Sequence, residues 1–219
     1  PLSSSSAASD VYKRQVAVFL SDALPTGHEI GVQYGSVTPG SDVMIVGAGP
    51  VGMGVLLTSQ FYSPATITVV DMDDNRLAKA REMGATHTLN PASDDVNARV
   101  GDITEGRGVD TAIEAVGLPA TWKTCADNVK EGGNIAVVGV HGKPVEFPLQ
   151  EMWIKNLTVT TGLVNANTTG MLLKAVQNSD LPIKSLATHH FTWDQLGEAW
   201  ETFSHADEHQ AMKVIIDNV

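Results

Sequence analysis

The sequence contains hardly any cysteine. Cys125 is the single cysteine among 219 residues, so no disulfide can form within the chain. This usage is typical of a reducing compartment, and we expect a cytoplasmic protein. Cys125 falls in a predicted helix, Thr121–Val129, where a small buried residue is the expected role and a catalytic thiol is the alternative.

Basic residues and long apolar runs are also scarce. The chain has 14 Lys and Arg against 25 Asp and Glu, a formal net charge of −11. Because nucleic-acid-binding surfaces need a basic cluster, which the sequence does not show, we exclude a nucleic-acid partner. The longest apolar run, Val43 to Leu57, is interrupted by glycines. It indicates a strand followed by a helix, so we expect no membrane partner.

The N-terminal 15 residues differ in composition from the rest. Leu2 to Ser9 is a low-complexity run of serine and alanine. Pro1 to about Gln15 resembles non-native adapter sequence, and the alternative is a native flexible tail that buries too little apolar surface to fold. We therefore leave residues 1–15 out of the predicted fold and expect native sequence to begin near Val16, inside a longer protein.

A glycine-rich turn follows a strongly apolar predicted strand. Val43–Val46 runs into Gly47, Ala48, Gly49, Pro50, Val51 and Gly52, and a predicted helix, Val51–Tyr62, comes next. In a dinucleotide site the first glycine permits the tight turn, the second lets the backbone approach the pyrophosphate, and the third lets the helix pack on the strand. Pro50 suits a first helical turn, whose free N–H groups attract phosphate. The motif predicts dinucleotide binding, with an ordinary strand–helix turn as the alternative.

An acidic residue ends the next predicted strand. Asp71 follows Ile67–Val70, at about the spacing of roughly 20 residues that the dinucleotide fingerprint requires. Its carboxylate can accept hydrogen bonds from a ribose hydroxyl, whereas a 2′-phosphate would meet Asp71, Asp73 and Asp74. The sequence therefore predicts NAD rather than NADP.

Strand and helix patterns alternate from Asp42 onward, which predicts an α/β fold with a doubly wound, six-stranded parallel sheet of the Rossmann type. Ligands bind such sheets beyond the carboxyl ends of the strands. The predicted strands are Val43–Val46, Ile67–Val70, Thr86–Leu89, Val109–Val116, Asn134–Val140 and Leu157–Val164, and the predicted helices are Val51–Tyr62, Asn75–Met83, Val96–Ile103, Thr121–Val129 and Leu149–Lys155.

The pattern changes after Val164, and we divide the chain into residues 1–15, 16–165 and 166–219. The last part contains two predicted helices, Thr169–Gln177 and Trp193–Phe203, and a final strand, Lys213–Ile216. It is too short to build a core of its own. We expect three tryptophans to be packing residues: Trp153, Trp193 and Trp200.

Four stretches together resemble the zinc-dependent medium-chain alcohol dehydrogenases. They are Asp22-Ala23-Leu24-Pro25-Thr26-Gly27, the Gly47–Gly52 turn, Asp71-Met72-Asp73-Asp74-Asn75-Arg76-Leu77 and Ile113-Glu114-Ala115-Val116-Gly117. The resemblance covers Val16–Val219. It implies a catalytic domain that precedes the dinucleotide domain and is completed by the C-terminal segment.

The resemblance also implies a catalytic zinc. One ligand in this family stands four residues before a Thr-Gly pair, which makes Asp22 the implied ligand here; the alternative is a helix cap or a solvated acid. Zinc would act as a Lewis acid on an alcohol, whose hydride passes to NAD and leaves an aldehyde or ketone. Because the other ligands are absent from the sequence, we expect a truncated fragment that binds NAD without turnover.

Further roles follow from the same resemblance. Thr26 would lie near the nicotinamide, or else be a helix cap, and Arg76 would cover the adenine, or else be a surface residue. Val116, Val140 and Leu163 would line the crevice. The edge strand Leu157–Val164 would pair subunits into a homodimer or homotetramer.

The sequence leaves other functions open. The substrate could be a polyol, an amino-acid alcohol or formaldehyde, since enzymes for these share the cofactor domain. A zinc-free reductase and a non-catalytic NAD-binding module are the remaining alternatives.

Overall fold

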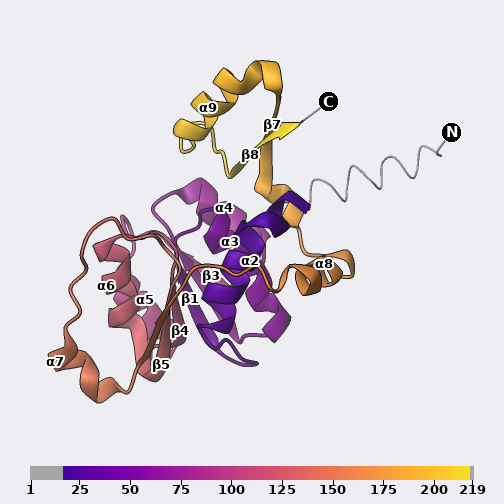
Figure 1. Ribbon diagram of the computed structural model, residues 1–219. Helices are drawn as coiled ribbons and strands as arrows, with labels where there is room; N and C mark the ends of the chain where they lie inside the picture. Colours follow the sequence, from indigo (N-terminus) through magenta and orange to yellow (C-terminus); the bar gives the residue numbers. More distant parts are fainter. Residues whose placement is uncertain (1–16, 218–219) are drawn as a thin grey trace.

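A computed structural model describes residues 17–217, and the predicted leader, residues 1–15, lies outside the described residues. The largest element is a six-stranded sheet with the order β3-β2-β1-β4-β5-β6 (Figure 1), and every neighbouring pair in it is parallel. The predicted α/β class and the doubly wound sheet are therefore confirmed.

The strands of this sheet alternate with helices along the chain. The strands are β1 (Asp42–Val46), β2 (Thr66–Val70), β3 (His87–Leu89), β4 (Val109–Glu114), β5 (Val129–Val137) and β6 (Thr158–Thr161). The helices between and after them are α3 (Pro50–Ser59), α4 (Asp74–Glu82), α5 (Val96–Ile103), α6 (Pro119–Asn128), α7 (Leu149–Met152) and α8 (Thr169–Gln177).

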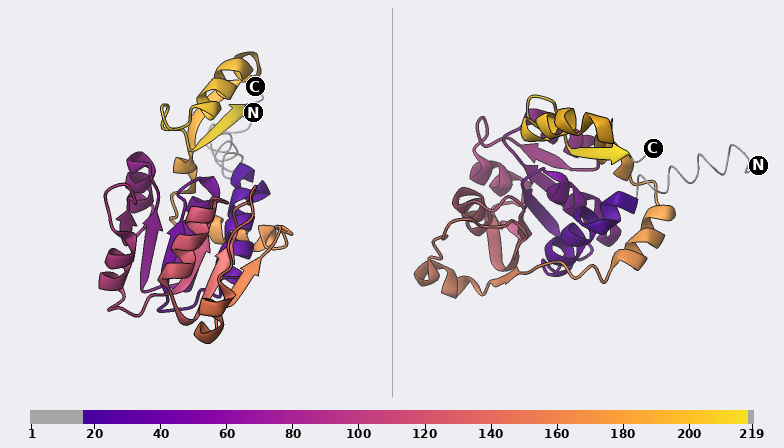
Figure 2. Two further views of the ribbon diagram at one scale, coloured as in Figure 1. Left: turned by 90° about the vertical axis from the view of Figure 1, so that its left-hand side faces the viewer. Right: turned by 45° about the horizontal axis from the view of Figure 1, so that its top comes forward.

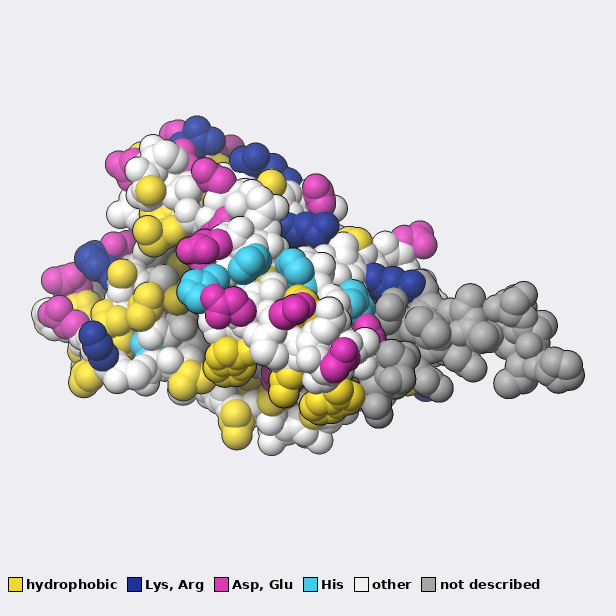
Figure 3. Space-filling model, turned by 90° about the horizontal axis from the view of Figure 1, so that it is seen from above, with side chains coloured by type: hydrophobic (Ala, Val, Ile, Leu, Met, Phe, Trp, Pro, Cys, Tyr) yellow, Lys and Arg dark blue, Asp and Glu magenta, His cyan; other side chains and the backbone are white. Residues whose placement is uncertain are grey.

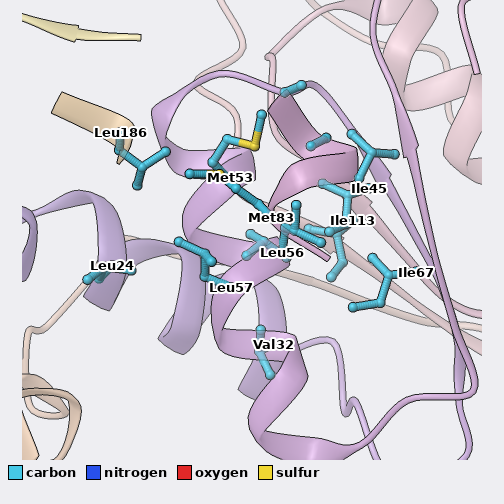
Figure 4. Close-up of a cluster of buried hydrophobic side chains, with 14 of the residues drawn as sticks. Leu24, Val32, Ile45, Met53, Leu56, Leu57, Ile67, Met83, Ile113 and Leu186 are labelled. Atoms are coloured by element: carbon cyan, nitrogen blue, oxygen red, sulfur yellow. The ribbon is translucent and has the colours of Figure 1, made fainter. Parts of the chain in front are cut away.

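Strand β1 shows how the sheet is buried on both faces. Its side chains alternate between two hydrophobic cores: Val43 and Ile45 lie in one, and Met44 and Val46 lie in the other. The first core contains side chains of α3 and α4, and the second contains side chains of α5 and α6, so helices cover both faces (Figure 2). Figure 4 shows the first core, where Leu56 of α3 lies among sheet residues. This double burial explains the continuous apolar runs of the strands.

Three predicted strands extend too far at their carboxyl ends. β4 stops at Glu114 rather than Val116, because the Glu114 carboxylate accepts the amides of Val116 and Gly117 and so draws them away from the ladder. β5 stops at Val137, which leaves Val140 in a loop, and β6 stops at Thr161, which leaves Leu163 in a loop.

A helical segment precedes the sheet and was not predicted. It comprises η1 (Val18–Ser21), α2 (Ala23–Thr26) and a π-helix, η2 (Gly27–Gln33). It packs closely on α3 through glycines: a Cβ on Gly27 would lie 2.6 Å from the Val55 nitrogen. Gly27 and Gly31 resemble helix breakers in the sequence pattern, but here they allow close helix–helix contact.

The C-terminal part forms a second, smaller sheet. β7 (Ala187–Thr192) pairs in parallel with β8 (Lys213–Asp217), and α9 (Leu196–Ser204) contacts both strands (Figure 1).

The expectation that the tryptophans are packing residues is wrong, because Trp153, Trp193 and Trp200 are largely exposed. Hydrophobic side chains also reach the surface on the face seen from above (Figure 3).

Candidate functional site

A cleft of about 640 Å³ opens at the carboxyl ends of the strands. It lies where the strand order reverses, since β1 and β4 are neighbours in the sheet but not in the sequence. This is the position at which open α/β sheets bind ligands. Its lining includes residues at or beside the carboxyl ends of β1, β2 and β4 and the starts of α3, α4 and α6: Val46, Gly47, Gly49, Val70, Asp71, Arg76, Val116, Leu118 and Thr121.

The three glycines of the turn have different surroundings. Gly47 has a φ of +108°, a conformation that favours glycine. A Cβ on Gly52 would overlap the carbonyl oxygen of Gly47, so the absence of a side chain lets α3 start directly behind the turn. A Cβ on Gly49 would have no neighbour within 4 Å, and Gly49 lines the cleft. The surroundings thus match the turn, the close packing and the open backbone that the motif predicts.

The carboxylate of Asp71 joins the end of β2 to the glycine turn. Its Oδ2 accepts the Ala48 amide at 2.6 Å and its Oδ1 accepts the Asp73 amide at 2.9 Å. Asp73 in turn caps α4 by accepting the amides of Asn75 and Arg76. These bonds hold Asp71 at the cleft before any ligand arrives, which reduces the cost of ordering it on binding.

Arg76 lies at the same end of the cleft. Its Nε is 3.6 Å from Asp73 Oδ2. This Nε is buried and has no hydrogen-bond partner. An unpaired buried donor is costly, and the nearby Asp73 carboxylate offsets part of this cost electrostatically.

Glu114 lies beside the cleft, and the sequence reasoning gave it no role. The side chain is fully buried at the end of β4. Its Oε1 accepts the Val116 and Gly117 amides and, at 2.6 Å, the Thr121 hydroxyl, and its Oε2 lies 3.2 Å from His141 Nε2. One carboxylate therefore joins the loops that follow β4 and β5. An acidic residue at the end of an apolar strand was the available signal.

Other predicted site residues do not line this cleft. Val140 and Leu163 follow β5 and β6 and are 91% and 86% exposed, so they lie on the same edge of the sheet but in the open. Thr26 ends α2, and its hydroxyl donates to Asp22 Oδ1 at 3.1 Å. Pro50 and Val51 form the first turn of α3, next to the glycine turn.

The part of the chain that the structure describes does not fit a zinc ion by itself. No three His, Cys, Asp or Glu residues between 17 and 217 come together as a metal would require. Asp22 is exposed, and Thr26 is its side-chain hydrogen-bond partner. Three protein ligands are the rule for a catalytic zinc, so no chemical step is assigned to zinc here.

Cys125 lies in the core, as expected. It is completely buried on α6. Burial, and then the charge of Glu114, raises the pKa of its thiol well above the ordinary value.

Within residues 17–217, which the structure describes, no helix has the length and apolar character that crossing a membrane demands.

Comparison with known sequences shows a shared family. The sequence model of the family described as zinc-binding dehydrogenase matches residues 50–178. Sorbitol dehydrogenase of Bacillus subtilis is 33% identical over 165 residues, which are 74% of this chain and 46% of that protein. Sorbitol dehydrogenase of Rattus norvegicus is 30% identical over 185 residues, 83% of this chain and 51% of that protein. The chain thus spans about half the length of the curated relatives it matches.

Solved structures show the same likeness. Zinc dependent alcohol dehydrogenase 2 from Streptococcus pneumonia, in its apo form, superposes with a TM-score of 0.86 at 51% identity, over 90% of this chain and 57% of that one. Alcohol dehydrogenase TADH from Thermus sp. ATN1 superposes with a TM-score of 0.85 at 30% identity, over 91% of this chain and 57% of that one.

Proposed function

Because this chain belongs to the zinc-binding dehydrogenase family, we propose that it binds NAD and is the cofactor-binding part of an enzyme that interconverts an alcohol with an aldehyde or ketone. The observation that carries the proposal is the cleft at the reversal of strand order, where Gly49 presents open backbone and Asp71 presents a fixed carboxylate. NAD supplies a hydride acceptor when it is bound.

The residues of the cleft suit the parts of NAD. The N-terminus of α3, with Gly47, Gly49, Pro50, Val51 and Gly52, would bind the pyrophosphate. Asp71 would accept the ribose hydroxyls, and Arg76 would lie beside the adenosine. Val116 lies in the cleft wall and would lie on the path toward the nicotinamide, which itself would lie among Thr26, Val140 and Leu163.

The roles of the remaining parts belong to the same proposal. Residues 16–165 form the dinucleotide unit, and residues 166–219 contribute to a catalytic unit. Asp22, which is exposed beside Thr26, would serve as one ligand of a catalytic zinc, but residues 17–217 do not bring together the three ligands that such a zinc needs. We therefore expect no alcohol turnover by this chain alone.

Subunit pairing would use the edge of the large sheet. β6 is its outer strand, so one side of β6 has no strand neighbour in the sheet. An unpaired edge offers backbone groups to a second copy. We therefore propose a homodimer or homotetramer of the whole enzyme.

A polyol is the second candidate substrate class. The relatives from Bacillus subtilis and Rattus norvegicus are both named sorbitol dehydrogenase, which favours a polyol.

A non-catalytic NAD-binding module is the alternative outside enzyme chemistry, and such a module would show the same cofactor binding.

The proposed cofactor is tested by titration calorimetry of the 219-residue chain with NAD and NADP. We expect NAD to bind more tightly than NADP. Asp71→Asn should weaken NAD binding by about tenfold or more, since a hydrogen bond to a charged group contributes roughly 1.5–3 kcal/mol.

Asp207→Asn is the matched control, because Asp207 is exposed near the small sheet, and it should leave NAD affinity unchanged. Melting curves of both variants separate lost binding from lost folding. Absence of NAD binding, or equal affinity for NADP, would contradict the proposal.

A further inference from the structure

We propose that Glu29 is a positioning residue for the nicotinamide end of the cofactor site. It holds the segment of residues 160–168, which carries Leu163, against the helix that follows Thr26. This role rests on the proposed NAD binding, because it concerns how that site is shaped.

The carboxylate of Glu29 accepts hydrogen bonds from several groups of one loop. Glu29 is only 5% exposed. Its Oε2 accepts the amides of Asn165 at 2.9 Å and Ala166 at 3.1 Å, and its Oε1 accepts both the amide and the hydroxyl of Thr168 at 2.8 Å. A carboxylate that accepts several N–H groups makes stronger hydrogen bonds than a neutral acceptor would. The loop after β6 is therefore fixed by a residue more than a hundred positions earlier in the chain.

The element that carries Glu29 is itself fixed to the cofactor site. Glu29 lies on the π-helix η2, which directly continues α2 and thus follows Thr26. η2 packs so closely on α3 that a Cβ on Gly31 would lie 2.7 Å from a methyl group of Val55. Since α3 begins at the glycine turn, Glu29 links the loop after β6 to the helix proposed to bind the pyrophosphate. π-helices are rare and frequently occur at functional sites.

The same π-helix region also holds the chain before Leu163. The Thr160 hydroxyl donates to the Tyr34 carbonyl at 3.2 Å. Gly162 lies against Ile30, since a Cβ there would be 3.3 Å from the Ile30 side chain. Leu163 is 86% exposed and so is not held by packing of its own side chain. Its position follows from anchors on both sides, Gly162 before it and the Glu29 contacts after it.

The loop needs these contacts because its backbone is strained. Ala166 has a φ of +55°, a left-handed conformation that is unfavourable for a residue with a side chain. The hydrogen bond from the Ala166 amide to Glu29 offsets part of that cost. A purely structural alternative is that Glu29 only stabilises the start of α8, whose preceding residue, Thr168, donates its hydroxyl to Glu29.

The test compares two ligands that differ at the nicotinamide. NADH carries the nicotinamide, and its fluorescence reports the environment of that ring, whereas ADP-ribose lacks it. In the full chain, Glu29→Gln should weaken NADH binding by about tenfold and reduce the fluorescence enhancement of bound NADH. The affinity for ADP-ribose, measured by calorimetry, should stay within about twofold of the unchanged chain.

Glu201→Gln is the matched control, because Glu201 is exposed on α9, and it should change neither affinity. Equal weakening of NADH and ADP-ribose by Glu29→Gln, or no weakening of either, would overturn the positioning role and leave the proposed function intact. Failure of the unchanged chain to bind either ligand would instead overturn the proposed function. If Glu29→Gln does not fold by circular dichroism, Thr168→Val, which removes one donor, takes its place with the same expected pattern.

Discussion

Substitution by alanine at two glycines of the turn should affect different properties, stability at Gly52 and ligand binding at Gly49. In Gly52→Ala the new methyl group overlaps the carbonyl oxygen of Gly47, which is backbone and cannot move by rotating a side chain. In Gly49→Ala the methyl group meets no protein atom within 4 Å, and it is added to a residue that lines the cleft. The first change should damage the fold, and the second should damage ligand binding.

The size of the stability effect at Gly52 follows from two opposing contributions. Overpacking costs about 1–3 kcal/mol, and the backbone contact places Gly52→Ala near the upper end of that range. Alanine gains about 1 kcal/mol over glycine inside a helix. The net loss is therefore about 2 kcal/mol, which for a chain of this size lowers the melting temperature by roughly 4–8 °C.

Gly49→Ala should leave the melting temperature within about 2 °C. Gly49 is the N-cap of α3 with a φ of −72°, which alanine also adopts. The smaller entropy of the unfolded chain stabilises the variant, while alanine is a poorer N-cap than glycine, and the two effects offset each other. NAD affinity should fall about tenfold or more, because the methyl group occupies the space proposed for the pyrophosphate.

The assay is a melting curve and an NAD titration for each variant. Gly101→Ala is the matched control: Gly101 lies in α5, a Cβ there meets no atom within 4 Å, and the melting temperature should rise by roughly 2–4 °C. An unchanged melting temperature of Gly52→Ala would refute the packing argument. Unchanged NAD affinity of Gly49→Ala would refute the placement of the pyrophosphate.

Two further predictions concern titratable side chains. Burial raises the pKa of Glu29, but hydrogen bonds from Thr168, Asn165 and Ala166 outweigh it and hold that pKa below its ordinary value of 4.5. The stabilising contribution of Glu29 is present above pH 4.5 and is lost as pH falls through the lower folded pKa. In Glu29→Gln the free energy of unfolding, measured by urea titration at a series of acidic pH values, should therefore fall less steeply with decreasing pH. An unchanged pH dependence would contradict this. Because burial raises the thiol pKa, Cys125 should react with iodoacetamide only after unfolding, and rapid labelling of the folded chain would contradict its core position.

Local sequence patterns predicted most of the large sheet. Helix α5 begins and ends where its pattern predicts, and the predicted turn from β1 into α3 has the expected geometry. These features depend on neighbouring residues: apolar runs mark strands that are covered on both faces, and glycines mark the turn. The position of Asp71 at the cleft also follows from its place at the end of β2.

The ends of the strands were harder to predict, since they depend on side-chain acceptors that compete with the neighbouring strand for backbone amides. The amides of Val116 and Gly117 leave the ladder because the buried Glu114 carboxylate accepts them. The helical segment before the sheet was missed for a related reason. Gly27 and Gly31 resemble helix breakers in the sequence, although in the structure they allow close packing on α3.

The sequence by itself therefore determined the family resemblance, the order of strands and helices, the glycine turn and Asp71, on which the proposed preference for NAD rests, because each depends on patterns of neighbouring residues. Only the tertiary structure decided what Glu29 and Glu114 do. Glu114 lies beside His141 of the loop after β5, and the donors to Glu29 come from the loop after the edge strand β6. A buried carboxylate must find donors wherever the fold brings them, and no local pattern records which loop supplies them.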